Sequence, residues 1–439
     1  MRRSIFAALR LFSALDQRLR VRLTLAGWLV FGAAGAAAAA GLNTNLTVTY
    51  RAFAFLAALL ALSWIASLFY RTRIEASREM PRYATAGEPF SYRISVVNRG
   101  ARTLAGALLT ERFRDPRPSF DEWRRTREPG EEQRNWFDRN VGYFRWRWLI
   151  DRRVPRDLEP AAIAPLAPGE HQSVKLGFTP RRRGRIEFLG LTLGRPDPLG
   201  LVKGLVRVPL EARLIALPKR YRLPEIALPG RRRFQPGGVS LAASVGDSEE
   251  FLALRDYRPG DPLQRVHWKS FARTGKPVVK EYQDEFFERH ALVLDTGSMR
   301  GEDAAFEEAI ALAASFVYTI DTQDCLLDLL LVGGEVRAYT AGRGQMNAEH
   351  MLEALAGVGP SVPREFEALA RAVMARRATL SSVIAIFVSW DAERERFIAS
   401  LRAEGFEVRA LLVREEGDAP RGVLQLRPGK IEQGLAALR

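Results

Sequence analysis

Two long stretches without a charged side chain constrain this chain more than any other feature. Residues 23–41 and residues 52–70 each form a nineteen-residue run without Asp, Glu, Lys or Arg. A helix of about 20 apolar residues crosses the hydrocarbon core of a bilayer, which is ~30 Å thick. We therefore expect a transmembrane helical hairpin within residues 1–71. A signal peptide is the alternative for the first stretch, because basic residues precede it.

The distribution of arginine around the two stretches predicts their orientation. The loop between them has no charge before Arg51, whereas arginines gather outside the pair. They are Arg2, Arg3, Arg10, Arg18, Arg20 and Arg22 on one side and Arg71, Arg73, Arg78 and Arg82 on the other. Basic flanks stay in the cytoplasm. We expect a multi-pass protein of the cell inner (plasma) membrane, with both termini and the main domains cytoplasmic. The single cysteine, Cys325, agrees with a reducing compartment.

The middle of the chain has the period of β-strands. Apolar residues alternate at Phe90, Tyr92, Ile94 and Val96, and again over residues 174–178, with Gly, Pro and Asn between the runs. Alternation bounded by turn residues is typical of strands with one buried face. Residues 72–225 are therefore predicted to form an antiparallel β-sandwich of six or seven strands, without helices of convincing period among them.

Residues 111–157 interrupt this pattern with four tryptophans among many arginines. Arginine beside aromatic rings suits stacking on nucleic acid, and the net charge of +15 suits either nucleic acid or an anionic membrane. No recognisable nucleic-acid module surrounds the segment, so contact with the membrane or packing on the sandwich is favoured. No nucleic-acid partner is expected, and the role of the segment stays open.

Residues 290–439 alternate between buried strands and helices. The apolar run 290–295 is typical of a buried parallel strand. Segments with the period of helices alternate with further strand-like runs after it. This alternation predicts an α/β doubly wound sheet with helices on both faces. Ligands of such sheets bind at the carboxyl ends of strands, which here are Asp295 and the pair Ser389–Asp391.

The linker, residues 226–289, carries an unusually charged strip. Asp261, Arg265 and His267 resemble an acid–base set, but no nucleophile or phosphate-binding loop accompanies them. A structural role is the stronger interpretation: Trp268 packs under the sheet, and Asp261 forms a buried pair with Arg265 or Arg273. Partner binding is compatible with it, since Trp and Arg dominate interfaces.

The chain resembles a known arrangement at this point. Residues 290–439 look like a von Willebrand factor A domain. The transmembrane hairpin, the sandwich and the strip together resemble a bacterial family of unknown function that accompanies MoxR-type AAA+ ATPases. The strip motif is carried by Tyr257, Gly260, Asp261, Arg265, Val266, Trp268, Ala272 and Arg273. The resemblance implies a non-enzymatic adaptor or assembly factor with a MoxR-type ATPase as partner, and it leaves client and oligomeric state open.

The same resemblance raises the question of a metal. In von Willebrand factor A domains the first strand ends in Asp-x-Ser-x-Ser, which coordinates a divalent cation. Here Asp295 is present, but Gly297 and Met299 replace the serines, and the hydroxyls of Thr296 and Ser298 are out of phase. Asp391 is either a later ligand or the N-cap of a helix. A degenerate Mg²⁺ or Mn²⁺ site at Asp295 and Asp391, serving a cation-dependent ligand binder, is one alternative function. A basic binder of anionic lipid or nucleic acid that uses residues 111–157 is the other.

Overall fold

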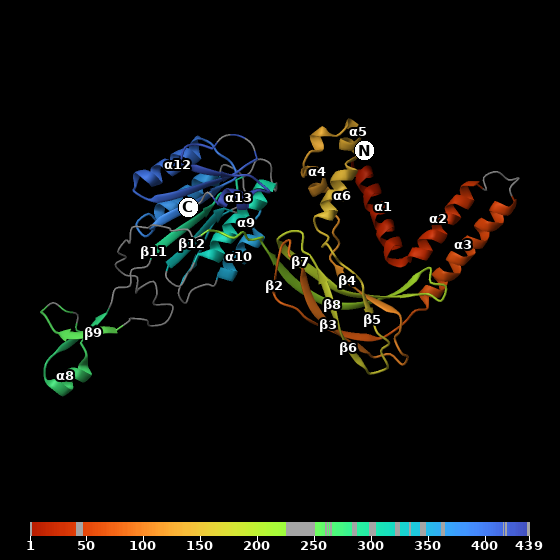
Figure 1. The fold of residues 1–439 in the computed structure, drawn as a ribbon, viewed down its shortest axis with the longest axis horizontal. Helices are drawn as coiled ribbons and strands as arrows, with labels where there is room; N and C mark the ends of the chain where they lie inside the picture. Colours follow the sequence, from red (N-terminus) through yellow and green to blue (C-terminus); the bar gives the residue numbers. More distant parts are fainter. Residues whose placement is uncertain are drawn as a thin grey trace. The chain divides into compact units, whose positions relative to one another are not determined.

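A computed structural model of the chain describes residues 2–40, 47–224, 251–259, 261, 263, 266–282, 288–297, 304–320, 325–332, 335–342, 348–360, 365–415, 417 and 419–436. The chain divides into two compact units, Met1–Lys219 and Arg220–Arg439. Figure 1 labels many of the helices and strands of both.

Three helices open the first unit: α1 (Arg2–Arg22), α2 (Leu25–Ala40) and α3 (Thr47–Leu68). α2 and α3 lie side by side (Figure 1). Among the described residues, Val48–Leu68 is long and apolar enough to cross a membrane, and α2 is a shorter apolar helix. The 16 residues of α2 extend over about 24 Å at the rise of an α-helix. The described part of the first span is thus shorter than the predicted nineteen residues.

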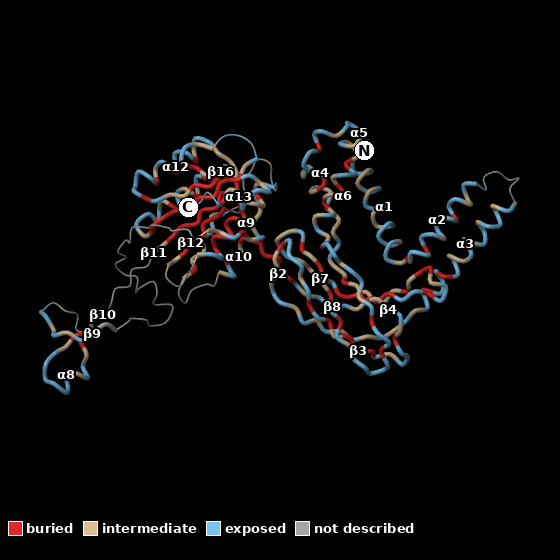
Figure 2. Tube along the Cα trace, in the orientation of Figure 1, coloured by how far each residue is buried: buried red, intermediate tan, exposed pale blue. Residues whose placement is uncertain are grey.

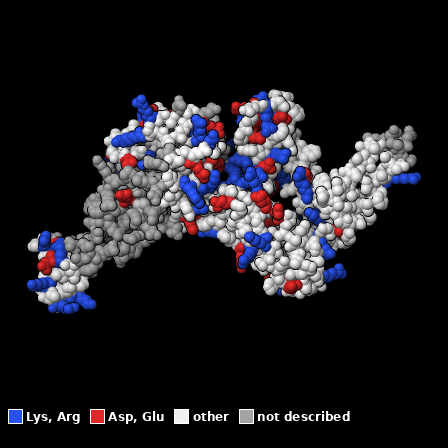
Figure 3. Space-filling model, viewed as in Figure 1, with Lys and Arg blue, Asp and Glu red and all other residues white. Residues whose placement is uncertain are grey.

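The outer surface of these two helices is apolar. Leu25, Leu29 and Phe55 are 81%, 68% and 64% exposed. Figure 2 colours most of both helices exposed or intermediate, and Figure 3 shows this arm largely without charge. An exposed apolar surface of this kind marks a contact with a membrane or a partner. The helices therefore support membrane association, on length and composition alone.

Two sheets follow α3. The first has the order β1-β3-β6, with bounds Ile74–Glu79, Phe90–Asn98 and His171–Phe178. The second has the order β2-β8-β7-β4-β5, with bounds Tyr83–Thr85, Lys203–Leu217, Gly184–Pro196, Ala107–Phe113 and Ala161–Ile163. All neighbouring strands pair antiparallel except β2 and β8, which are parallel.

One hydrophobic core joins the two sheets. Tyr92, Ile94 and Val96 of β3 are buried in it with Leu191 and Leu193 of β7. The alternation in the sequence predicted these three β3 residues and Phe90 to face inward, and Phe90 packs against the same core while partly buried. Two mostly antiparallel sheets around a shared core have the layered arrangement of a sandwich.

An ion pair is buried in this core. Arg78 donates to both carboxylate oxygens of Glu111 at 2.9 and 2.8 Å, and the Tyr92 hydroxyl donates to Glu111 Oε1 at 2.8 Å. Burial raises the pKa of Glu111, and the charge of Arg78 acts against that rise. The sequence analysis grouped Arg78 with the membrane-flanking arginines, but its place in β1 is in phase with the inward residues Ile74 and Ala76.

The segment 111–157 contains short helices that the sequence analysis did not predict. These are α4 (Phe120–Arg125), η1 (Glu131–Gln133), α5 (Trp136–Val141) and α6 (Tyr143–Asp151). Trp123 and Trp146 are each 2% exposed and pack against Phe6 of α1. Trp123 and Trp146 thus pack on α1, and not on the sandwich. Trp136 and Phe137 are 69% and 65% exposed, and contact with the membrane stays a prediction.

In the second unit, β9 (Phe251–Asp256) and β10 (Val278–Tyr282) form an antiparallel pair, and α8 (Trp268–Thr274) lies between them in sequence. Val266 bridges to Val279, and both side chains are buried. We refer to the described residues from Phe251 to Tyr282 as the β9–α8–β10 segment.

The other strands of the second unit form a six-stranded sheet of order β13-β12-β11-β14-β15-β16. β13 pairs antiparallel with β12, and all other neighbours are parallel. The strands in chain order are β11 (Glu288–Leu294), β12 (Cys325–Val332), β13 (Val336–Ala341), β14 (Ser382–Phe387), β15 (Glu407–Val413) and β16 (Val423–Leu426).

Helices accompany this sheet: α9 (Ala304–Thr319), α10 (Ala348–Gly357), α11 (Phe366–Ala375), α12 (Ala392–Ala403) and α13 (Ile431–Leu435). α11 and α12 pack on Ala291, Val293 and their neighbours in one hydrophobic core. Leu292 and Leu294 alternate with those residues along β11 and are fully buried as well. Since successive side chains of a strand point to opposite faces, both faces of the sheet are covered near β11. Figure 2 shows these strands buried.

Candidate functional site

The predicted motif centres on Asp261, which fixes the turn after β9. The Arg255 guanidinium donates to both carboxylate oxygens of Asp261 at 2.7 and 2.8 Å, and the Arg258 N–H adds a bond of 2.9 Å. The side-chain hydrogen bond from Arg255 lowers the pKa of Asp261 to about 2, and that from the Arg258 backbone acts in the same direction. The prediction that Asp261 pairs with Arg265 or Arg273 was wrong for Arg273. Arg255, the second-last residue of β9, lies across the turn and takes both carboxylate oxygens.

Trp268 lies on the surface of the β9–α8–β10 segment. Its side chain is 60% exposed and makes an edge-to-face contact with Phe271, whose ring centroid is 6.1 Å away. The prediction that Trp268 packs under the sheet was therefore wrong. The small core of the segment is already occupied by Val266 and Val279. Leu263 is 66% exposed as well, so the described surface of this small segment is rich in large apolar side chains.

The motif residues that the structure describes do not assemble into a catalytic set. Tyr257 is half-buried and its N–H donates to the Pro277 carbonyl at 3.0 Å. Arg273 is exposed in the last turn of α8. His267 Nδ1 lies 2.6 Å from Ser270 Oγ, while Asp261 is engaged by Arg255. Gly260 and Arg265 lie outside the described residues.

The second predicted site lies at the carboxyl end of β11. Asp295 follows this strand, is 2% exposed, and accepts a hydrogen bond of 2.9 Å from the Gly297 N–H. Asp391 follows β14, the neighbouring strand, and caps α12 by accepting from the N–H groups of Glu393 and Arg394 at 3.1 Å. The parallel pairing of β11 with β14 brings the two loops to one edge of the sheet. Of the two roles considered for Asp391, it has that of the N-cap.

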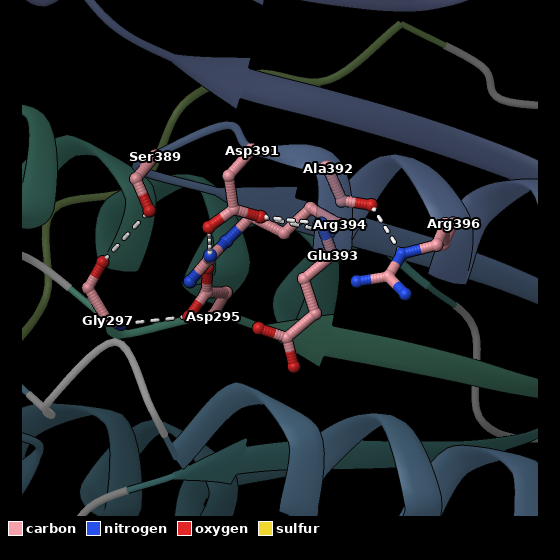
Figure 4. A network of polar contacts seen from close by, with 8 residues as sticks. All are labelled: Asp295, Gly297, Ser389, Asp391, Ala392, Glu393, Arg394 and Arg396. Atoms are coloured by element: carbon pink, nitrogen blue, oxygen red, sulfur yellow. Dashed lines mark hydrogen bonds and ion pairs between the residues drawn. The ribbon is translucent and has the colours of Figure 1, made fainter.

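A guanidinium lies between these two carboxylates (Figure 4). Arg394 Nε is 2.7 Å from Asp295 Oδ2, and Arg394 Nη1 is 2.5 Å from Asp391 Oδ2. Arg394 is fully buried, and its guanidinium carbon stands 4.6 Å from the centroid of the Phe366 ring. Asp295 and Asp391 are thus brought together as predicted, but around a cation that belongs to the chain itself.

The electrostatics of this cluster oppose a bound metal. Burial raises the pKa of Asp295, and the hydrogen bond from Arg394 acts against that rise. Burial disfavours the charged form of Arg394, but the hydrogen bond and charge of Asp295 outweigh it and raise the pKa of Arg394. A divalent cation here would meet a fixed positive charge. Among the described residues no three His, Cys, Asp or Glu side chains converge as metal ligands. The residues present do not fit a divalent cation.

Arg394 was missed in the sequence, although a signal for it existed. Arg394, Phe397, Ile398 and Leu401 are all buried and follow the spacing of one helix face. An arginine that occupies the first position of the apolar face of a helix is buried with that face and needs a counter-ion. Asp295 was already the most conspicuous carboxylate at the end of a predicted strand. Arg255 carried no comparable signal, because several arginines lie equally close to Asp261 in sequence.

Comparison with known proteins supports part of the resemblance. Residues 253–427 match a family described as "Protein of unknown function DUF58". The matched residues include Asp261, Trp268, Asp295 and Arg394. The chain is also 26% identical over 176 residues to the uncharacterized protein YeaD of Bacillus subtilis (strain 168). That alignment covers 40% of this chain and 42% of the relative, so the chain matches less than half of the relative's length.

Likeness to solved structures is slight. The CARDB domain of PF1109 from Pyrococcus furiosus is 12% identical, with 31% of this chain and 94% of that one covered, at a TM-score of 0.16. A PapD-like domain of human CEP192 is 16% identical, with 33% and 87% covered, at a TM-score of 0.16. Scores this low support no conclusion about fold or function.

Proposed function

We propose that this protein is a membrane-anchored, non-enzymatic adaptor that works with a MoxR-type AAA+ ATPase. In this proposal α2 and α3 form a transmembrane hairpin in the inner membrane, and both units and both termini are cytoplasmic. The ATPase, the topology and the absence of catalysis come from the resemblance and from the arginine flanks in the sequence. The observation that carries the proposal is the exposed aromatic surface of the β9–α8–β10 segment.

The sheet of the second unit supports its assignment as a doubly wound, von Willebrand factor A-like domain. β11 is central, β12 lies on one side of it, and the chain crosses to the other side at β14. Ligands of open α/β sheets bind where the strand order reverses in this way. Asp295 and Asp391 lie at that edge. Because Arg394 engages both carboxylates, the edge offers neither of them unpaired to a metal, and we assign it to a partner protein instead.

The β9–α8–β10 segment has the features of a protein-docking element. Trp268 and Phe271 are 60% and 38% exposed, and Lys269 and Arg273 lie on the same short helix. Trp and Arg are enriched among the residues that contribute most to binding, and a Trp in a partner's pocket contributes several kcal/mol at most. The Arg255–Asp261 pair and the Val266–Val279 bridge hold the turn, so these aromatic residues are presented from an ordered framework.

Affinity purification from native membranes tests this function. The tagged wild-type protein is extracted in a mild detergent beside Trp268→Ala/Phe271→Ala. The matched control is Trp136→Ala/Phe137→Ala, which removes two aromatic residues of α5 that are 69% and 65% exposed. We expect the wild type and the control to recover an AAA+ ATPase, and the α8 variant to recover roughly tenfold less or none.

Two results would count against the proposal. Equal recovery with the α8 variant would show that this segment is not the docking surface. No AAA+ ATPase with any of the three proteins would reject the adaptor function itself. Thermal unfolding of the purified variants checks that each still folds, and it is expected to do so because the four truncated side chains are exposed.

A further inference from the structure

A cavity of about 1020 Å³ lies in the first unit, between the C-terminal half of α1 and the outer face of the five-stranded sheet. β4, β7 and β8 form its floor. Their registers set Leu108, Gly194 and Leu205 in one row across the sheet, and Thr110, Thr192 and Arg207 in the next. The central strand β7 contributes only glycine and threonine to these rows, so the floor is hollow in the middle and partly apolar.

The walls of this cavity are strongly basic. Nine Lys or Arg side chains line it. One acidic side chain, Glu111, lines it as well and is already paired with Arg78. Arg20, Arg114, Arg117 and Arg153 have carboxylate partners. Within the part of the chain that the structure describes, Arg18, Arg22, Arg112, Lys203 and Arg207 have none. Five such cations around one hollow repel one another, and a bound anion would relieve that repulsion.

Arg112 adds an independent observation. Its Nη2 donates to the Leu189 carbonyl at 3.2 Å, but its Nε is buried and has no hydrogen-bond partner among the described residues. A buried donor without an acceptor is costly. Arginine presents several donors in one plane, which match the oxygens of a phosphate group. Arg112 thus places in the floor of the cavity a guanidinium that is hydrogen-bonded only through Nη2 among the described residues.

The cavity also lies beside the apolar helices. Lys203 follows Leu201 and Val202, which pack against Leu23, two residues before α2 begins. The Arg22 guanidinium lies over the ring of Trp64 in α3, 4.9 Å from its centroid. α1 itself exposes Leu11, Phe12 and Leu15 at 59%, 70% and 44%. A helix with basic residues and an exposed apolar stripe lies in the interface of a bilayer.

We propose that this cavity binds one anionic phospholipid, with the phosphate of the headgroup among Arg18, Arg112, Lys203 and Arg207. The inference rests on the proposed anchoring of α2 and α3 in a membrane, but not on the ATPase. Basic pockets beside transmembrane helices on the cytoplasmic side bind anionic headgroups. The apolar floor and the exposed stripe of α1 favour a lipid over free phosphate, which has no apolar part to bury. The lipid would hold α1 and the sandwich at the membrane surface.

Native mass spectrometry of the full chain in a non-ionic detergent tests this site. Phosphatidylglycerol and phosphatidylcholine with identical acyl chains are added in parallel. The test variant is Arg112→Gln/Arg207→Gln, and the control is Arg93→Gln/Arg213→Gln. The control removes the same charge at two exposed positions that do not line the cavity. We expect the wild type and the control to retain one phosphatidylglycerol, and the test variant to bind it roughly tenfold more weakly.

Each other outcome overturns the inference. Equal retention of both lipids by the wild type would exclude a site for an anionic headgroup. An equal loss in the test and control variants would reduce the effect to general surface charge. Competition by millimolar inorganic phosphate would make the ligand a free anion. The measurement is made in detergent without any ATPase, so a negative result would not count against the adaptor proposal. Equal melting temperatures of the wild type and the two variants exclude misfolding.

Discussion

Arg394 shows how a single residue decides what the edge of the second unit's sheet can bind. It is a fully buried cation with Asp295 and Asp391 as counter-ions. Arg394→Leu would leave the Asp295 carboxylate buried without its charge partner. Breaking a buried pair in this way costs about 3–5 kcal/mol in the free energy of unfolding. We expect hydrogen–deuterium exchange of the β11 and β14 amides to be correspondingly faster in the variant.

Arg396→Leu is the matched control for this change. Arg396 lies on the same helix, and within the described part of the chain it donates only to the Ala392 carbonyl, at 3.1 Å (Figure 4). Exposed substitutions of this kind change the stability by about 0.5 kcal/mol or less. We also expect Mg²⁺ and Mn²⁺ to leave the exchange of the wild type unchanged. Slower exchange with either ion would show that a cation displaces Arg394, and would revive the metal site at Asp295.

At the scale of elements, the contact between α2 and the β7–β8 turn depends on Gly27. A Cβ on Gly27 would stand 2.1 Å from the Leu201 carbonyl oxygen. Thr24 fastens the same contact, since its N–H donates to that oxygen at 3.1 Å. Gly27→Ala therefore forces α2 away from the sandwich, at a cost of about 1–3 kcal/mol. We expect the Thr24 amide to exchange hydrogen roughly tenfold faster in this variant.

Gly32→Ala provides the comparison, because a Cβ on Gly32 meets nothing within 4 Å. Alanine is favoured over glycine in a helix by about 1 kcal/mol, so Gly32→Ala should leave the exchange of Thr24 unchanged or slow it. Similar acceleration in both variants would mean that loss of glycine in α2, and not the contact with Leu201, controls the docking of this helix.

The sequence predicted those elements whose own hydrophobic period identifies them as a helix or a strand. Tyr92, Ile94 and Val96 alternate along β3, and β11 is a continuous buried run, so both were visible without any knowledge of their partners. The helices α4, α5 and α6 were not, because they have only 6, 6 and 9 residues. Their core includes Phe6, more than a hundred positions away. A helix that is stabilised by a distant segment has no signal of its own.

The candidate site was predicted to a similar extent. Asp295 and Asp391 were placed correctly at one edge, because the carboxyl ends of neighbouring parallel strands meet there. Their shared partner was not predicted, since Asp295 and Arg394 are separated by 99 positions. For Asp261 the pairing was assigned among arginines later in the chain, whereas the turn brings back Arg255 from the preceding strand. The local sequence shows which residues are charged, but the tertiary fold determines which of them form ion pairs with one another.

For the whole molecule, the central prediction is that both units lie on the cytoplasmic side of a membrane crossed by α2 and α3. The 22 residues of α3 extend over about 33 Å, enough for a hydrocarbon core of about 30 Å. Two cysteine positions test the topology in a Cys325→Ser background. Thr44→Cys lies between the two helices in sequence, and Ser77→Cys lies at an exposed position of β1.

A maleimide that does not cross membranes is applied to spheroplasts and, separately, to opened membranes. We expect Thr44→Cys to be labelled in both preparations and Ser77→Cys only after the membranes are opened, because the arginine-rich flanks stay in the cytoplasm. Labelling of Ser77→Cys alone in spheroplasts would invert the topology and place the β9–α8–β10 segment where no cytoplasmic ATPase reaches it. Protection of both positions in spheroplasts would mean that neither α2 nor α3 crosses the bilayer, because a crossing by α3 alone would place positions 44 and 77 on opposite sides.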